Sequence, residues 1–185
     1  MVGVDSAVAL LQQARQLGLE RDLPAHWVRG DIRDLPLRQE SCAAVVLIDA
    51  FGFFEADDEN ERVLAEAMRI VVPGGFLAMK VVNGEPILAS FRPTDREDRQ
   101  GVVVTISRTL TGEPARLLER VSISGPRGDG QYERRQRLYR VGDLLAAAKR
   151  VGFTSAEVFA DAHGATFEPA ASPTMWVIGQ RAHAV

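Results

Sequence analysis

The chain has 185 residues, of which 46% are hydrophobic and 25% are charged, and its formal net charge is −3. This length suits one globular domain with a sizeable core, and the mild acidic balance argues against a nucleic-acid partner held by charge. There is no apolar run of the roughly 18–20 residues that a membrane span needs, no visible signal peptide and only one cysteine, Cys42, so we expect a cytoplasmic protein without a membrane partner.

The first part of the chain alternates short apolar runs with one helical pattern. Residues 2–5 predict a buried strand, and Ser6 is a suitable N-cap for a helix over 7–17, which Gly18 would end. The β-prone residues 26–29 predict a second strand. The run 43–48 is apolar without alternation, which is typical of a strand covered on both faces in a parallel sheet.

The alternation continues to residue 82. Asp57 and Asp58 predict the start of a helix, because a helix N-terminus favours negative charge. The apolar residues that follow at helical spacing predict that this helix ends before Pro73. The turn Pro73-Gly74-Gly75 would lead from this helix into a strand over 76–82. Strands alternating with helices over 1–82 indicate a parallel sheet with right-handed crossovers.

The second half has a different character, and we expect it to form an antiparallel meander followed by a return to the α/β body. The segment 83–100 is polar and predicted to be irregular. The later predicted elements are strands over 102–106, 116–124 and 131–140, a helix over 142–150, and strands at about 154–160 and 174–180. We therefore expect a single α/β domain, residues 1–185, with an inserted loop and β-meander at 83–140.

Acidic residues occur where successive predicted strands end. Asp5 and Asp49 end the first and third strands, and Asp31 follows the second. The carboxyl ends of parallel strands meet at one edge of an open α/β sheet, where such sheets bind ligands. The sequence therefore predicts an acidic ligand crevice at this edge, and we predict no metal site.

Four motifs in this order resemble those of the class I S-adenosylmethionine-dependent methyltransferases: Val2-Gly3-Val4-Asp5-Ser6, Gly30-Asp31-Ile32, Ile48-Asp49-Ala50-Phe51-Gly52-Phe53-Phe54 and Val72-Pro73-Gly74-Gly75. The tail, from Tyr139 through Val151-Gly152-Phe153 to Asp161-Ala162-His163-Gly164, resembles the small-molecule members that carry a β-meander before the last helix. The resemblance implies a Rossmann-like methyltransferase sheet, S-adenosyl-L-methionine as cofactor, and methyl transfer to a nitrogen, oxygen or carbon of a small molecule.

The resemblance also implies roles for the first two acids. Asp5, with Ser6 beside it, would accept hydrogen bonds from the two ribose hydroxyls of the cofactor. The alternative for Asp5 is a cap on the following helix. Asp31 would accept from the adenine amino group while Ile32 packs on the ring face, and the alternative for Asp31 is an ordinary turn aspartate.

The segment after the third strand would meet the methionine end of the cofactor. Asp49 and Ala50 are expected there, with Asp49 a weak candidate for a general base. Phe51, Phe53 and Phe54 would line the methyl-transfer pocket and face the cationic sulfonium, or else serve as core or lid residues.

The remaining polar candidates are on loops. His163 is a second weak candidate for a general base, and a solvated loop histidine is the alternative. The arginines at 92, 96 and 99 could bind an anionic substrate or could form a solvated charged loop. Methyl transfer depends chiefly on positioning the nucleophile, so a strong catalytic signature is not required.

Family members begin with a strand and a glycine-rich loop before the position of Val2, and here Met1 stands at that place. The resemblance thus implies an N-terminally truncated sheet that lacks its central strand. We weigh three expectations: a reading frame that starts further upstream, an inactive fragment or methyltransferase-like scaffold, and one half of a split methyltransferase. The last would need a partner chain, or a homo-oligomer, to complete the sheet. A nucleotide-dependent dehydrogenase is a less suitable alternative, because it does not predict the acid at position 31.

Overall fold

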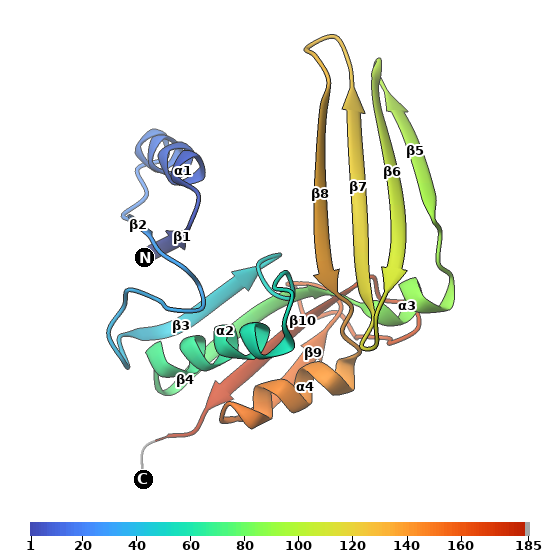
Figure 1. Cartoon of the computed structure of the whole chain (residues 1–185). Helices are drawn as coiled ribbons and strands as arrows, with labels where there is room; N and C mark the ends of the chain where they lie inside the picture. Colours follow the sequence, from blue (N-terminus) through green and yellow to red (C-terminus); the bar gives the residue numbers. More distant parts are fainter. Residues whose placement is uncertain (184–185) are drawn as a thin grey trace.

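The computed structural model describes residues 1–183 and contains helices and three separate β-sheets (Figure 1). One sheet has two strands, in the order β1-β2. The second has the order β3-β4-β10-β9, and the third has the order β5-β6-β7-β8. None of the helices in residues 1–183 is both long and apolar enough to cross a membrane.

The N-terminal unit is a strand–helix–strand. β1 (Val2–Asp5) pairs in parallel with β2 (His26–Arg29), and α1 (Val8–Glu20) connects them. The predicted stop at Gly18 is wrong, because the helix continues to Glu20. Gly18 instead lies against the indole of Trp27, where a Cβ would be 3.5 Å from Nε1. The helix N-cap is Ala7, so the predicted capping role of Ser6 is also wrong.

The central sheet contains β3 (Cys42–Ile48), β4 (Val71–Val82), β10 (Thr174–Arg181) and β9 (Phe153–Phe159). β3 and β4 are parallel, while β10 runs antiparallel to both of its neighbours. Two amphipathic helices, α2 (Asp57–Ile70) and α4 (Val141–Arg150), cover the same side of this sheet (Figure 1).

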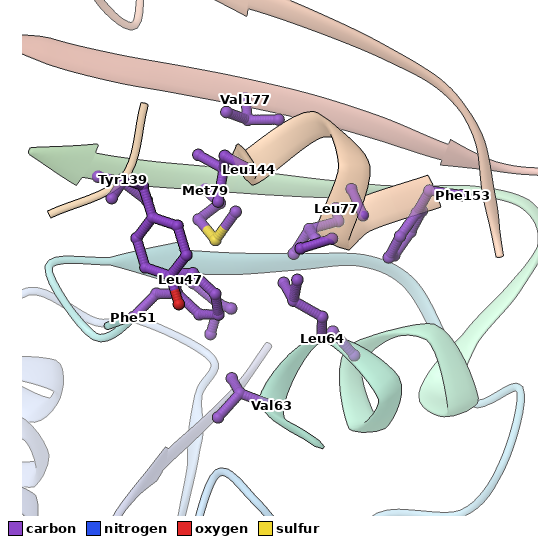
Figure 2. Close-up of a cluster of buried hydrophobic side chains, with 14 of the residues drawn as sticks. Leu47, Phe51, Val63, Leu64, Leu77, Met79, Tyr139, Leu144, Phe153 and Val177 are labelled. Atoms are coloured by element: carbon purple, nitrogen blue, oxygen red, sulfur yellow. The ribbon is translucent and has the colours of Figure 1, made fainter. Parts of the chain in front are cut away.

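The hydrophobic core lies between these helices and the sheet. Leu64 of α2 and Leu144 of α4 are fully buried there and face the alternate residues Leu77 and Met79 of β4 (Figure 2). The opposite face of the sheet is more open, since Val46, Ile48 and Phe76 are 60%, 53% and 44% exposed.

The Pro73-Gly74-Gly75 segment lies inside a strand, so the predicted turn between helix and strand is wrong. β4 begins at Val71, directly after α2. Gly74 has φ +79°, in the left-handed region that favours glycine, and the pairing with β3 shifts register here. A Cβ on Gly75 would lie 2.6 Å from the carbonyl oxygen of Ala43, so close strand contact also requires glycine.

The inserted segment forms the third sheet and a short helix. α3 (Gly84–Ala89) follows β4 and leads to four antiparallel strands: β5 (Thr94–Arg99), β6 (Val102–Thr111), β7 (Arg116–Ser124) and β8 (Gly130–Arg137). The prediction of an irregular 83–100 is therefore wrong. The charged residues 94–99 form an exposed edge strand, and charged side chains on an edge oppose pairing with other chains.

A groove separates the first two sheets. No backbone ladder joins β1 to β3 within residues 1–183, and Figure 1 shows the β1–β2 unit apart from the central sheet. The groove has a volume of about 530 Å³ and is lined by Met1, Val2 and Val4 on one side and by residues 41–47 on the other. Because consecutive residues of β3 line it, the groove runs along the unpaired edge of that strand.

Candidate active site

Asp5 ends β1 and closes the turn that leads into α1. Its Oδ1 accepts a hydrogen bond from the backbone N–H of Ala7 at 2.7 Å, next to the start of α1. Within the described part of the chain no hydrogen bond to Oδ2 is recorded, so this oxygen is available to a ligand. The alternative of a helix cap is wrong, because the N-cap is Ala7 and no described side chain caps the helix; the turn bond leaves half of the Asp5 carboxylate free.

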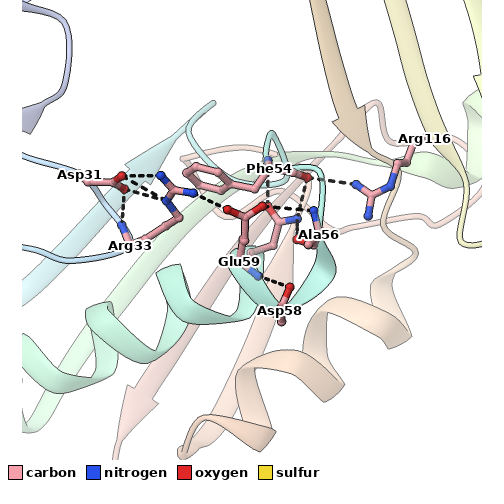
Figure 3. A network of polar contacts seen from close by, with 8 residues as sticks. Asp31, Arg33, Phe54, Ala56, Asp58, Glu59 and Arg116 are labelled. Atoms are coloured by element: carbon pink, nitrogen blue, oxygen red, sulfur yellow. Dashed lines mark hydrogen bonds and ion pairs between the residues drawn. The ribbon is translucent and has the colours of Figure 1, made fainter.

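Asp31 lies in the tight turn after β2 and is bound by Arg33 (Figure 3). Arg33 Nη2 donates to Oδ2 at 2.6 Å and Nε donates to Oδ1 at 3.0 Å, while the Arg33 backbone N–H donates to Oδ1 at 2.8 Å. These bonds favour the ionised form and lower the pKa of Asp31 to about 2. A ligand that hydrogen-bonds to Asp31 must share this carboxylate with Arg33.

Arg33 also connects the turn to the start of α2. Its guanidinium forms an ion pair with Glu59 in the first turn of the helix, and its Cζ lies 4.3 Å from the centroid of the Phe54 ring (Figure 3). Ile32 is partly buried against the core. Asp31, Phe54 and Glu59, which are distant in the sequence, therefore meet around one guanidinium.

Asp49 follows β3 in an unusual backbone conformation. Its φ is +51°, a region that aspartate tolerates better than most residues with a Cβ, and its side chain is 54% exposed. Lys80 of β4, whose register partner is Ile48, donates from Nζ to Asp49 Oδ2 at 2.9 Å. The side chain of Asp49 is thus oriented by a cation and remains open to solvent.

The three phenylalanines after Asp49 have different environments. Phe51 is 1% exposed and packs on Tyr139 with ring centroids 5.1 Å apart, so its position is that of a core residue. Phe53 and Phe54 are half-buried, and a ring face of Phe54 contacts Arg33. Burial also raises the pKa of Tyr139 to about 12, which keeps its hydroxyl protonated.

The loop that carries these rings is fixed by Asn60 and by the inserted sheet. Asn60 is fully buried, accepts from the Phe54 N–H at 3.4 Å, and donates to the carbonyls of Phe54 and Ala56 at 3.2 and 3.1 Å. Arg116 of β7 donates to the Phe54 carbonyl at 3.1 Å and pairs with Asp57 at 2.5 Å. The loop position therefore depends on α2 and on the insertion together.

The loop candidates are exposed. His163 is an exposed residue of the β9–β10 connection, and its backbone N–H donates to Asp161. Arg96 is exposed on β5, and Arg99 forms an exposed pair with Glu97. No group of acidic, cysteine or histidine side chains within residues 1–183 is arranged to hold a metal ion.

Sequence reasoning missed four residues that shape the site: Arg33, Asn60, Lys80 and Arg116. Arg33 had a local signal, because it stands two residues after Asp31 in a turn closed by an Asp34 N–H to Asp31 carbonyl bond of 3.0 Å. The other three contact the site across strands or between elements, so no sequence pattern could identify them.

The strand ends offer hydrogen-bond acceptors from Asp5 and Asp49 and, at Asp31, a carboxylate that is shared with Arg33. Hydroxyl and amino groups are the ligand groups that such acceptors bind.

Comparison with known proteins agrees with the sequence motifs. Residues 1–79 match the family model described as a methyltransferase domain. No curated protein has a matching sequence.

Solved structures share the fold across nearly the whole chain. An S-adenosylmethionine-dependent methyltransferase from Clostridium acetobutylicum is 12% identical, with a TM-score of 0.84 over 98% of this chain and 74% of that one. The CcbJ methyltransferase from Streptomyces caelestis is 19% identical, with a TM-score of 0.84 over 99% and 74%. The sugar N-methyltransferase KedS8 from Streptoalloteichus sp. is 20% identical, with a TM-score of 0.66 over 98% and 70%. The predicted α/β, Rossmann-like methyltransferase fold is confirmed.

Proposed function

We propose that this chain is a class I S-adenosylmethionine-dependent methyltransferase and that it methylates a nucleophilic atom of a small molecule; the methyltransferase-domain match of residues 1–79 and the shared fold support this. The observation that supports the proposal most directly is the set of carboxylates Asp5, Asp31 and Asp49 at successive strand ends. The cofactor supplies a methyl group that its sulfonium already activates.

The residues of this chain would bind the cofactor and orient it. The free oxygen of Asp5 would accept from a ribose hydroxyl, with Ser6 adjacent, and Asp31 would accept from the adenine amino group while keeping Arg33. Asp49 and Ala50 would flank the methionine end, and Lys80 would hold the Asp49 carboxylate in place. Positioning alone can contribute several kcal/mol to such a displacement.

The acceptor is proposed to be a small molecule. KedS8, one of the proteins of similar fold, is described as a sugar N-methyltransferase, and the inserted sheet stands beside the aromatic loop as a wall for such a ligand. A nitrogen nucleophile needs no strong general base, which agrees with the exposed positions of His163 and Asp49. We also propose a cytoplasmic location, because the chain has a single free cysteine.

We further propose that the working site contains an added strand in the groove between β1 and β3, supplied by a partner chain or a second copy. Within residues 1–183, two strand edges with unpaired backbone groups face this groove, and such edges are templates for pairing with another strand. Hydrogen exchange tests this idea. Slow exchange at the groove-side amides of 43–47 supports a filled groove, and rapid exchange at all of them contradicts it.

The first test of the function is calorimetric titration of S-adenosylhomocysteine into the 185-residue chain, its Asp5→Ala and Asp31→Ala variants, and Asp129→Ala as a matched control in the β7–β8 turn. Each acid variant should weaken binding about tenfold, the effect of about 1.4 kcal/mol from one lost charged hydrogen bond, and the control should not. No binding by any of them would favour the alternative, an inactive methyltransferase-like scaffold.

A further inference from the structure

A cavity of about 370 Å³ lies between α3 and the inserted sheet. Asn83 lies in the wall of the cavity and is held by three hydrogen bonds. The buried side chain donates to the carbonyls of Pro169 and Ser172 at 2.7 and 2.8 Å and accepts from the Glu85 N–H at 3.1 Å. Most of the lining is apolar, from Val82, Pro86, Ile87, Phe91, Leu117 and Pro173. The cavity is therefore a preformed pocket for a largely apolar ligand.

A charged row crosses three strands at the sheet side of this cavity. Arg108, Glu119 and Arg134 are register partners on β6, β7 and β8, and all three line the cavity. Arg108 Nε donates to Glu119 Oε1 at 2.8 Å, and Arg134 Nε donates to Oε2 at 2.5 Å. Glu119 is only 4% exposed, and although burial raises its pKa, the bonds from the two arginines outweigh this and lower it.

Both carboxylate oxygens of Glu119 are thus occupied, whereas the arginines retain donors. Each guanidinium has five N–H groups, of which the Glu119 contacts use only some. Arg92, which also lines the cavity, forms no ion pair with any residue in the range 1–183. Three arginines face two carboxylates here, Glu119 and Asp95, so the cavity has a net positive charge of one.

The cavity adjoins the proposed methyl-transfer site. Gln136, in its wall, lies beside the aromatic loop, because a Cβ on Gly52 would be 3.7 Å from Gln136 Cγ. Val82, also in its wall, ends β4, the strand that pairs with β3 and holds Lys80 against Asp49. A molecule in the cavity therefore sits next to the loop that follows Asp49.

We propose that this cavity binds the methyl acceptor and that the acceptor has an apolar body with one anionic group, held by Arg92, Arg108 and Arg134. That the bound molecule is the methyl acceptor rests on the proposed function. That the cavity selects an anion follows from the residues that line it. A cationic ligand is disfavoured by the net positive charge, whereas an anionic group gains charge-assisted hydrogen bonds from the arginines.

The test compares benzoate with its neutral analogue benzamide in ligand-observed NMR titrations of the 185-residue chain, with and without S-adenosylhomocysteine. Benzoate should bind about tenfold more tightly than benzamide, because hydrogen bonds to a charged group are stronger than those to a neutral one. Arg92→Gln and Arg134→Gln should each remove most of that preference. Arg120→Gln is the matched control, because Arg120 is exposed and neighbours Glu119 on the other face of β7.

Arg92→Gln carries the test if Arg134→Gln does not fold, because Arg92 belongs to no ion pair within the described residues. Equal binding of benzoate and benzamide, or an unchanged benzoate preference in Arg92→Gln, overturns the inference. If the same chain binds S-adenosylhomocysteine, the proposed function still stands. A benzoate preference in a chain that does not bind S-adenosylhomocysteine supports the anion site and overturns its role for the acceptor.

Discussion

The buried side chain of Asn60 offers a direct test of how the aromatic loop is held. Asn60→Ala removes two hydrogen bonds of ordinary length, 3.1 and 3.2 Å, and one long bond of 3.4 Å. At about 1 kcal/mol for each ordinary bond and about 0.5 kcal/mol for the long one, the loss is about 2.5 kcal/mol. Alanine returns up to about 0.7 kcal/mol through its higher helix propensity. The free energy of unfolding should therefore fall by about 1.5–2.5 kcal/mol.

Urea denaturation followed by circular dichroism measures this change, with Glu61→Ala on the same helix as the control. Glu61 is 40% exposed and pairs with Arg150, so its loss should change the free energy of unfolding by less than about 1 kcal/mol. S-adenosylhomocysteine affinity should fall in Asn60→Ala as well, because the released loop begins directly after Asp49. A loss of under 0.5 kcal/mol in Asn60→Ala, roughly the value expected for a surface substitution, would refute this account of the loop.

Two further predictions follow from the sheets. Glu119 has a lowered folded-state pKa, so its stabilising contribution is present above the ordinary value of 4.5 and is lost as the pH falls through the folded-state pKa. Glu119→Gln should lower the free energy of unfolding by about 2 kcal/mol at pH 7, and this difference should shrink below pH 4.5 in urea titrations. A difference that does not change with pH would contradict the stabilising role of the ionised Glu119 carboxylate. Gly75→Ala should destabilise the chain by about 1–3 kcal/mol because its Cβ meets two backbone oxygens, at 2.6 and 2.9 Å. Gly142→Ala in α4, where a Cβ meets nothing within 4 Å, should be neutral or stabilising in the same urea denaturation assay, and equal losses of unfolding free energy in the two variants would contradict the clash.

The sequence by itself determined the strand–helix alternation of residues 1–82 and the fold class. Apolar runs and acids at strand ends are local patterns, so β1, β2, β3 and α2 lie within about one residue of their predicted ranges. The motifs of the resemblance are also local. Residues 1–79 accordingly match a methyltransferase-domain model, and the Rossmann-like methyltransferase fold is confirmed.

Local patterns failed where a neighbouring element decided the conformation. Gly18 was predicted to end a helix, yet packing against Trp27 keeps it inside α1. The charged residues 94–99 were predicted to be irregular, yet backbone pairing with β6 makes them a strand. Hydrogen bonds to a strand partner compensate for a poor intrinsic preference, and the sequence of one strand does not reveal that partner.

Only the tertiary structure decided how the candidate site is assembled. The Lys80–Asp49 pair follows from the β3–β4 register, and the contacts of Arg33 with Asp31, Phe54 and Glu59 join three separate segments. The charged row of Arg108, Glu119 and Arg134 on the inserted sheet likewise needs the alignment of three strands. Sequence patterns indicate which face of an element is apolar and where it ends, whereas the pairing of distant side chains is set by register and packing, which depend on the whole chain.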